Sequence, residues 1–463
     1  MRLFPRIPVI VLGLAPLVLA GAVAGPAAGA TAATASDCSG WNGVQPVNSA
    51  GSTTLDGIAV VSPCDVWAVG SGFPLSGSPP RQTVIEHWTG SAWATVPSPD
   101  PTSTTLQAVS AASASDIWAV GDNAAGALIL HYDGTGWTQS PTPPAGDDGT
   151  LWDVDGRTAS DAWAAGWTGD NTTRHALMLR WDGTSWTPSS LPAAVTGDGS
   201  EILSVSADSA TDAWALASAP GFTTLLHWDG SQWQTSSVTN ANGFVVRSVA
   251  ALSPTDAWAV GDDESTGHQL TMTEHWDGTR WNPVPTPSPG GTAQANDLAD
   301  VTATSGSDVW VAGSSFIGLT QNPFVLYWNG SSWAAVTLPV TGVLATDDVP
   351  ESISAAAGGQ AWVSGFAGFL EHQPLTPLAV PVPVVPDVSG DTVAAATSAL
   401  TAAGLTVSSS QNATTTCTPT LPNHVASTDP AAGQQAAYGQ AVTLTVCGAV
   451  VITPPSPSPA SPA

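Results

Sequence analysis

The strongest constraint on the fold of this chain is a tryptophan motif that recurs along most of its length. An aspartate stands two residues before a tryptophan in six places, and a glutamine takes its place in a seventh. The seven tryptophans, which lie 51, 45, 51, 44, 52 and 52 residues apart, are Trp67, Trp118, Trp163, Trp214, Trp258, Trp310 and Trp362. A unit of this size cannot bury its own aromatic side chains, so the units must pack against one another.

Six of the units carry a second motif, which predicts a β-hairpin. Its form at 275–281 is HWDGTRW, and related sequences stand at 87–93, 131–137, 180–186, 227–233 and 327–333. Asp277-Gly278 lies between alternating apolar residues, which predicts two strands joined by a two-residue turn with positive φ at both positions. With an apolar segment such as 106–109 and the strand DAWAVG at 256–261, each unit is predicted to form four short strands.

A repeat of this length with four strands per unit is typical of a β-propeller blade. We therefore predict a mainly β protein: a seven-bladed β-propeller over residues 37–373, followed by a small α+β domain. The seventh unit lacks the hairpin motif, and its third strand is expected at 369–372. The sequence at 41–46 aligns with that at 93–98, so we expect an N-terminal strand to complete the last blade and close the ring.

The two motifs together resemble the repeats of kelch-like and sialidase-like propellers, and especially the tryptophan-rich repeats of secreted actinobacterial proteins. The resemblance covers residues from about 40 to 373. It implies an architecture but no particular activity, because propellers host many unrelated functions. Sialidase chemistry would need arginines clustered around a carboxylate and a tyrosine nucleophile. Tyr132 and Tyr327 both occupy hairpin positions, so the sequence does not predict such a site.

A second domain is predicted after a segment rich in proline and valine at 374–384, which we expect to be an extended linker. Residues 385–448 contain VPDVSG, AGLTV, DPAAG and YGQAVTLTV in this order. These landmarks resemble the PASTA domain, a module associated with recognition of uncrosslinked peptidoglycan and β-lactams. The resemblance implies that cell-wall peptidoglycan is a partner of this protein.

Within the predicted PASTA domain we expect one helix and three strands. The helix is predicted over 391–403, with Asp391 as its cap and Gly404 at its end. Strands are expected at 405–407, 425–427 and 441–446. The Pro/Ser-rich tail at 449–463 is expected to be disordered.

The N-terminal sequence predicts export. Arg2 and Arg6 precede an apolar run that extends to about residue 24, and Ala-x-Ala sequences follow at 28–30 and 33–35. We therefore assign residues 1–35 to a secretory signal peptide, with an uncleaved membrane anchor as the alternative. The mature protein is expected to be extracellular, either released or associated with the cell wall, and to have no membrane contact after cleavage.

Charge and cysteine content limit the partners and the compartment. The chain has 8 Lys+Arg against 36 Asp+Glu, a net charge of −28, and all of its basic residues are arginine. Such a chain repels nucleic acid and anionic membrane surfaces. Four cysteines permit three pairings, of which Cys38–Cys64 with Cys417–Cys447 is favoured because each bridge then lies within one domain. Disulfides agree with an exported protein.

The repeated polar residues do not predict a catalytic, cofactor or metal site. One histidine position recurs in the hairpin motif, at His87, His131, His227, His275 and His372. Equivalent positions in a ring of blades lie far apart, so these side chains are expected to pack beside tryptophan rather than to bind one ion. The repeated aspartate of the tryptophan motif is expected to have a turn or backbone-bonding role in each blade.

Two sets of connections differ in their variability. The turns before the tryptophan motif and the hairpins keep nearly the same length, whereas the other connections, such as 71–83 and 122–127, do not. The variable connections are expected on one face, where loops often carry function. The candidate binding residues there, each with a merely solvated loop residue as the alternative, are Trp167, Arg174, His175, Asp262, Asp263, Glu264 and His268.

These features predict a secreted, non-enzymatic binding or scaffold protein. Its propeller would present a recognition face to a glycan or protein ligand, and its PASTA module would bind peptidoglycan. The alternative is a secreted glycosidase or lyase with its active site on the variable loops. Two loop carboxylates that converge on the channel mouth, such as Asp148 and Asp263, would favour this alternative. A third interpretation is a protein–protein platform in which the PASTA module is only a spacer.

Overall fold

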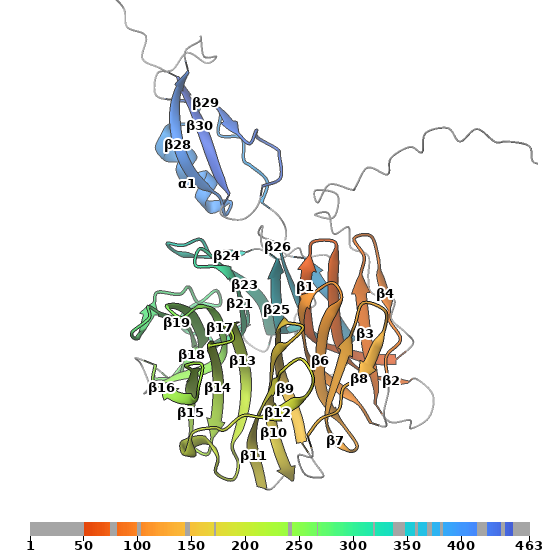
Figure 1. The fold of residues 1–463 in the computed structure, drawn as a ribbon. Coiled ribbons are helices and arrows are strands. Elements are labelled where there is room, and N and C mark those ends of the chain that lie inside the picture. The colour runs from red at the N-terminus through yellow and green to blue at the C-terminus, as the bar shows by residue number, and fades with distance from the viewer. Residues whose placement is uncertain are drawn as a thin grey trace, which may run out of the picture.

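The computed structural model describes residues 51–74, 81–99, 103–143, 149–170, 173–238, 243–265, 267–317, 320–336, 348–356, 360–367, 373–379, 383–413, 424–436 and 440–447. Within these ranges the chain forms strands β1 to β30, one α-helix and one short 3-10 helix, η2 (Ala193–Val195). The strands up to β27 are arranged as a ring of sheets, and the remaining elements form a separate small domain (Figure 1).

The sheets of the ring are antiparallel, and their strands follow one another in chain order. Sheet 1 contains β1 (Gly51–Ser62), β2 (Asp65–Pro74), β3 (Gln82–Trp88) and β4 (Trp93–Thr95). Sheet 2 contains β5 (Thr105–Ser113), β6 (Asp116–Asn123), β7 (Gly126–Tyr132) and β8 (Trp137–Gln139). Sheet 3 contains β9 (Gly149–Thr158), β10 (Asp161–Asp170), β11 (Thr173–Trp181) and β12 (Trp186–Pro188). Sheet 4 contains β13 (Glu201–Ser209), β14 (Asp212–Ala219), β15 (Phe222–Trp228) and β16 (Trp233–Ser236).

The remaining three sheets continue the same order. Sheet 5 contains β17 (Phe244–Ser253), β18 (Asp256–Asp263), β19 (Leu270–Trp276) and β20 (Trp281–Val284). Sheet 6 contains β21 (Asn296–Ser305), β22 (Asp308–Ile317), β23 (Thr320–Trp328) and β24 (Trp333–Val336). Sheet 7 contains β25 (Asp348–Ala356), β26 (Gln360–Ala367) and β27 (Gln373–Ala379). The described residues of the ring therefore form six four-stranded sheets and one three-stranded sheet, which resemble propeller blades.

The third strand of sheet 7 differs from the sequence prediction. β27 pairs with β26 and brings Gln373 opposite Ala367, so this strand lies in the segment predicted to be a linker and not at 369–372. Its prolines favoured a linker, but β27 is an edge strand within the described residues, and edge strands tolerate proline. The N-terminal strand predicted at 41–46 and His372 lie outside the described residues, so both expectations stay predictions.

The hairpins of the second motif also differ from the prediction. Trp276 pairs with Trp281, so the loop between β19 and β20 has four residues rather than two. Of these, only Gly278 has a positive φ, of 90°. Oδ1 of Asp277 accepts hydrogen bonds from the amides of Thr279 at 2.9 Å and of Arg280 at 3.0 Å. Hydrogen bonds from the side chains of Thr279 and Asn282, and then these two amide bonds, lower the pKa of Asp277. Because the aspartate carboxylate closes the loop, a two-residue turn is not needed.

The motif tryptophans hold neighbouring sheets together. Trp163 of β10 packs against Trp228 and Trp233 of the next sheet, with indole centroids 5.3 and 5.1 Å apart. Equivalent groups of aromatic residues join sheets 1 and 2, 2 and 3, 4 and 5, and 5 and 6. Trp362 of sheet 7 packs against Trp93 of sheet 1 at 5.7 Å, so the last sheet contacts the first and the ring closes.

Side chains of the innermost strands add hydrogen bonds between neighbouring sheets. The amide of Val60 in sheet 1 donates to Oγ of Ser354 in sheet 7 at 3.0 Å. The amide of Ala207 in sheet 4 likewise donates to Oδ2 of Asp155 in sheet 3 at 2.6 Å. Such bonds satisfy buried amides that no strand partner reaches, and they fix the spacing of the sheets around the axis.

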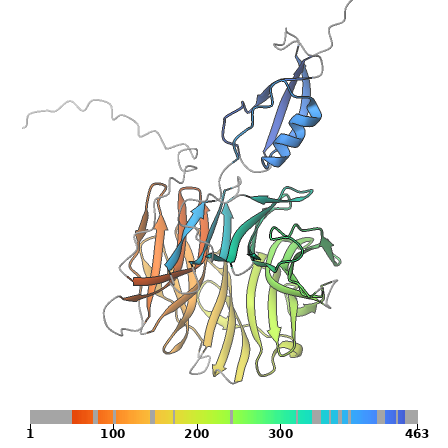
Figure 2. The same cartoon turned by 180° about the vertical axis from the view of Figure 1, so that it is seen from behind.

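The small domain has its own core. It contains α1 (Val393–Ala402), β28 (Thr406–Ala413), β29 (Val425–Asp429) and β30 (Ala441–Cys447). β30 lies between a parallel β28 and an antiparallel β29. Its buried apolar cluster, which includes Leu400, Val442 and Leu444, contains no residue of the ring. The domain lies beyond one end of the ring, as the view from behind also shows (Figure 2).

The cap of α1 differs by one residue from the prediction. Oγ1 of Thr392 accepts a hydrogen bond from the amide of Ala395 at 3.3 Å, so Thr392 and not Asp391 is the N-cap. Asp391 lies before the helix, where its amide donates to the carbonyl of Val388. Gly404 follows the helix with a φ of 79°, in agreement with its predicted role at the helix end.

Termini and cysteines are only partly described. Neither Cys64 nor Cys447 is a free thiol. Their predicted partners Cys38 and Cys417 lie outside the described residues, so both pairings stay predictions, as do the signal peptide at 1–35 and the tail at 449–463. Among the helices that the structure describes, none is long and apolar enough to cross a membrane.

Candidate functional site

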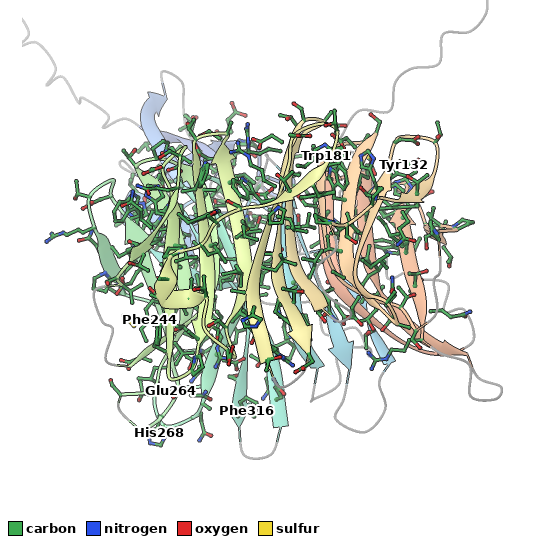
Figure 3. The ribbon with its side chains drawn as sticks, turned by 60° about the horizontal axis from the view of Figure 1, so that its bottom comes forward. Tyr132, Trp181, Phe244, Glu264, His268 and Phe316 are labelled. Atoms are coloured by element: carbon green, nitrogen blue, oxygen red, sulfur yellow. The ribbon has the colours of Figure 1, made fainter. Side chains whose placement is uncertain are left out.

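The two ends of the ring carry different connections. Tyr132 and Trp181, which end the third strands of their sheets, lie at the end that carries the hairpins (Figure 3). Glu264 and His268, in the connection between β18 and β19, lie at the opposite end (Figure 3). We call these the hairpin end and the variable end. The structure therefore places the variable connections on one face, as the antiparallel order of the strands requires.

The small domain stands on the hairpin side of the ring. A pocket there is lined both by Asn329 and Ser332 of the hairpin in sheet 6 and by Thr397 and Thr401 of α1. The variable end lies on the other side, so the small domain does not cover it (Figures 1 and 2). A ligand of the variable end could thus bind while the small domain is occupied.

The innermost strand of each sheet of the ring has a β-bulge at the same position of the repeat. A second register shift, near the end of this strand, occurs in sheets 1 to 6. In sheet 1, Leu55 pairs with Gly70 and Gly57 pairs with Val69, so Asp56 is an extra residue without a partner on β2. The same register shift in the other sheets leaves one extra residue each. These bulge residues are Asp56, Gln107, Trp152, Leu203, Arg247, Ala299 and Glu351. A bulge turns its extra side chain away from the regular direction of the strand.

The glycine at the end of the tryptophan motif lies opposite the bulge and accommodates it in six of the seven sheets. A Cβ at Gly70 would lie 1.9 Å from the carbonyl oxygen of Thr54, and one at Gly261 would lie 2.0 Å from that of Val245. Glycine permits this close approach of two backbones because it has no side chain. Sheet 4 forms its bulge with Ala217 at the equivalent position. At the motif glycines of sheets 1, 2, 3, 5 and 6 the missing side chain leaves room for this close approach, but the bulge in sheet 4 shows that glycine is not required for it.

All seven bulge residues line one cavity of about 810 Å³ on the axis of the ring. Thr54, Ser71, Arg81 and Thr105 add polar groups to its wall. The bulges lie in the first halves of the innermost strands, and these strands start at the variable end. The cavity therefore lies at the variable end of the channel, and a cavity of this size can hold a small ligand.

The cavity wall is divided by chemistry. Glu351 and Asp56 come from the adjacent sheets 7 and 1 and form an acidic side. Trp152 and Leu203 come from the adjacent sheets 3 and 4, across the channel, and form an apolar side. Arg247 of sheet 5 lies next to the apolar side.

Burial changes the acidity of the acidic side. It raises the pKa of Asp56 to about 6, although a hydrogen bond from Thr54 and the charge of Arg81 act in the opposite direction. Burial raises the pKa of Glu351 to about 7, and repulsion from Asp56 and Asp300 adds to this rise. No described residue donates a hydrogen bond to Glu351. Among the described residues, none supplies a charge that lowers the pKa of Glu351.

Two further aspartates in the cavity wall are engaged by the fold. Oδ2 of Asp153 accepts the amide of Val205 in the next sheet at 2.8 Å. Oδ2 of Asp300 accepts the amide of Ile353 in the next sheet at 2.9 Å. Burial raises the pKa of both aspartates, while these bonds lower it. Their carboxylates join sheets, so the two acidic bulge residues are the ones that can interact with a ligand.

Asp262, a predicted binding residue, is buried beneath the cavity wall. Its side chain is fully shielded from solvent, and its Oδ1 accepts a hydrogen bond from Nε of Arg247 at 3.0 Å. Burial raises the pKa of Asp262, and attraction by Arg247 opposes this rise. The expectation of a loop-surface residue is therefore wrong for Asp262, because β18 extends to Asp263 and turns this carboxylate inward. It orients the guanidinium group of Arg247 instead.

The other predicted residues of sheet 3 form a local cluster. The guanidinium carbon of Arg174 lies 4.5 Å from the centroid of the Trp167 indole, and its Nη1 donates to Glu201 at 3.1 Å. Trp167 is buried, which a loop residue would not be. Nδ1 of the exposed His175 lies 3.7 Å from Oδ1 of Asp198. This cluster does not line the central cavity.

The remaining predicted residues belong to sheet 5 and its loop. Oδ1 of Asp263 accepts the amide of Ser265 at 2.8 Å, and Oε1 of Glu264 accepts Nε2 of Gln269 at 3.2 Å. His268 is exposed in the same loop. Sheet 4 separates these residues from those of sheet 3, so the structure does not combine the two groups into one site. Their binding role stays a prediction.

The repeated histidines are paired with the repeated aspartates. Nε2 of His131 lies 2.7 Å from Oδ1 of Asp116, and its imidazole stacks on Trp118 with centroids 4.0 Å apart. The same pairs form between His87 and Asp65, His227 and Asp212, and His275 and Asp256. The predicted packing of histidine beside tryptophan is confirmed. These aspartates stand directly after the turns that precede the tryptophan strands, as expected, but among the described residues their carboxylates bond side-chain groups rather than backbone amides.

Sequence reasoning missed the bulge residues, although a signal for them exists. Each stands eleven residues before its motif tryptophan, and the seven positions hold seven different residues. Two positions later in the repeat, the residue is always isoleucine or valine: Ile58, Val109, Val154, Val205, Val249, Val301 and Ile353. Because this position varies completely while the position two residues later is always isoleucine or valine, packing does not fix its side chain.

Comparison with known proteins found similar solved structures but no curated relative. Among solved structures, YCF48 bound to a D1 peptide is 15% identical with a TM-score of 0.48, covering 73% of this chain and 94% of that chain. YCF48 from Cyanidioschyzon merolae is 14% identical with a TM-score of 0.47, covering 71% and 96%. An ulvan lyase, a polysaccharide lyase, is 9% identical with a TM-score of 0.46, covering 71% and 94%. No curated protein matches the sequence.

The small domain has a family match of its own. Residues 383–448 match the PASTA domain family. This range contains α1 and β28 to β30 and therefore the whole separate core of the small domain. The chain carries a C-terminal PASTA domain, which follows a ring of tryptophan-rich, propeller-like sheets.

Proposed function

We propose that this protein is a secreted, non-enzymatic binding protein of the cell wall. In this proposal a seven-bladed propeller binds a ligand in its central cavity, and the PASTA domain binds peptidoglycan. The C-terminal PASTA domain is the observation that carries the proposal, because this family is associated with peptidoglycan recognition. The N-terminal sequence at 1–35, which has the form of a signal peptide, supports export.

The arrangement of the two parts supports a divided function. The PASTA domain stands on the hairpin side, and the cavity lies at the variable end. A protein held at the wall through its PASTA domain would therefore present its cavity away from the attachment. Secretion can be checked by sequencing the N-terminus of the protein recovered from the medium or wall, which should start near residue 36.

Cosedimentation with purified peptidoglycan sacculi tests the wall-binding part of the proposal. Three proteins are compared: the mature chain, a chain that ends at residue 382 and a chain that starts at residue 383. The first cut must lie after β27, because sheet 7 needs this strand. We expect the mature chain and the PASTA chain to pellet, and the chain ending at residue 382 to stay in solution. Failure of the PASTA chain to pellet would contradict the proposed attachment.

A glycan-active enzyme is the second candidate, and one observation favours it. Asp56 and Glu351 are adjacent carboxyl groups in one cavity, and burial raises their pKa values to about 6 and about 7. Such a pair could act as acid and base near neutral pH. Incubation of the full chain with wall glycan, followed by a count of new reducing ends, tests this function. New ends that disappear with Glu351→Gln would establish an enzyme, and their absence would support binding alone.

A further inference from the structure

The cavity at the variable end is chemically asymmetric, and this asymmetry defines a class of ligand. Its acidic side carries Asp56 and Glu351, and Glu351 has no cation or hydrogen-bond donor among the described residues. Its apolar side carries Trp152 and Leu203. A ligand that complements both sides needs a positive group at one end and an apolar surface at the other.

We propose that the cavity binds an organic cation, in which an ammonium group lies between Asp56 and Glu351 and a partly apolar body packs against Trp152 and Leu203. This inference rests on the proposal that the ring is a binding module. It does not depend on the wall affinity of the PASTA domain.

The charges around the acidic side favour a cation. Glu351 faces the negative side chains of Asp56, Asp297 and Asp300. The two arginines of the cavity wall do not offset this charge. Arg247 is engaged by the buried Asp262 at 3.0 Å, and Arg81 lies near both Asp56 and Asp122, whose pKa values burial still raises to about 6. Asp56 is half-buried and Glu351 is open to the cavity, so a cation between them would be attracted by both carboxylates.

The lining favours an organic cation over a metal ion. In the described part of the chain, no group of three or more His, Cys, Asp or Glu side chains is placed to hold a metal ion. The carboxylates of Asp153 and Asp300 already accept amides of neighbouring sheets. The indole N–H of Trp152 donates to Glu201 at 3.1 Å, which fixes the indole while its body lines the cavity. An indole packs well against an aliphatic stem or the C–H face of a sugar.

An ammonium group on such a body has two common sources, and they require different probes. One is a lysine-like side chain of a peptide, represented by Nα-acetyl-lysine amide. The other is an unacetylated amino sugar, represented by the disaccharide of glucosamine. The neutral counterparts are Nα-acetyl-norleucine amide and the N-acetylated disaccharide. Titration calorimetry of the full chain at pH 8 should detect binding of at least one ammonium probe and of neither neutral probe.

Substitution of the two carboxylates tests where the cation binds. Glu351→Gln and Asp56→Asn should each weaken binding of the ammonium probe by about tenfold or more, because each removes one charge from the cation. Asp198→Asn is the matched control: it removes an exposed carboxylate at the variable end outside the cavity lining. This control should leave the affinity unchanged. Equal losses in all three variants would overturn the proposal, since only the net charge would then matter.

A pH titration of the unmodified chain tests the same point without any substitution. Asp56 and Glu351 are protonated below pKa values of about 6 and about 7 and charged above them. The lysine probe stays positive across this range. Its affinity should therefore fall by about tenfold or more between pH 8 and pH 5.5. A constant affinity, or binding of the norleucine probe as strong as that of the lysine probe, would refute the proposal.

The result for cation binding in the cavity can be separated from the result for wall binding. Glu351→Gln should pellet with sacculi as well as the unmodified chain does, because the PASTA domain is unchanged. If the chain fails to pellet but binds the ammonium probe, the cavity inference stands and the wall proposal fails. If it pellets but binds no probe at pH 8, the cavity inference fails.

Discussion

Single residues decide the chemistry of the cavity at the variable end, and most of them escape sequence reasoning. The seven motif tryptophans and the histidines beside them were predictable because their spacing is constant. The bulge residues were not, since a bulge depends on the register between two strands, which no single strand reveals. The pairing of His131 with Asp116 was also missed, because the two residues stand on different strands and meet only through the sheet.

The first residue-level prediction concerns Glu86, whose carboxyl group is buried in the fold and does not line the cavity at the variable end. Its side chain is 4% exposed, and its Oε2 has no hydrogen-bond partner among the described residues. Burial raises the pKa of Glu86 to about 7. The folded protein thus retains a proton that the unfolded chain releases above about pH 4.5, so the free energy of unfolding should decrease as the pH rises from about 4.5 to about 7.

Glu86→Gln should remove this loss of stability. We expect the variant to be more stable than the unmodified protein by about 1–3 kcal/mol at pH 8 and nearly equal to it at pH 4. Urea unfolding followed by tryptophan fluorescence measures the difference. Glu264→Gln, a change in an exposed loop, serves as the control and should have little effect at either pH. An effect of Glu86→Gln that does not vary with pH would contradict the argument.

At the level of elements, four strands per repeat were predictable for six sheets because both motifs are present in each. Sheet 7 was predicted less well. Without a hairpin motif, the position of β27 depended on pairing with β26, and prolines in the segment pointed to a linker. The predicted length of the hairpin loops was also wrong. The carboxylate of an aspartate such as Asp277 supplies the hydrogen bonds that a tight turn would otherwise make.

Closure of the ring gives a prediction at this level. Trp362 is fully buried between sheets 7 and 1 and packs against Trp93. Trp362→Ala and Trp93→Ala should each destabilise the ring by about 3–5 kcal/mol, as large cavities in cores do. If the segment at 41–46 supplies the fourth strand of sheet 7, Trp41→Ala should cost a similar amount in urea unfolding. A cost of Trp41→Ala below about 0.5 kcal/mol, the usual range for surface changes, would exclude this closure.

At the scale of the whole molecule, the sequence predicted two domains because their compositions and motifs differ. It could not place the PASTA domain on the hairpin side, because this arrangement depends on where β27 ends. The separate cores have a thermodynamic consequence. Since the apolar cluster of the PASTA domain contains no residue of the ring, the two parts should unfold in separate transitions.

Leu444→Ala tests this independence. Leu444 is fully buried in the PASTA core, so its truncation should destabilise that domain by about 2–5 kcal/mol. All 21 tryptophans lie before residue 383, so tryptophan fluorescence reports on the ring alone, whereas far-UV circular dichroism and calorimetry report on both parts. In Leu444→Ala the calorimetric transition of the PASTA domain should move to lower temperature while the fluorescence transition of the ring stays in place. In Trp362→Ala the fluorescence transition of the ring should move to lower temperature while the transition of the PASTA domain stays in place. If Leu444→Ala moves the fluorescence transition as well, the contact between α1 and the hairpin of sheet 6 must couple the two domains.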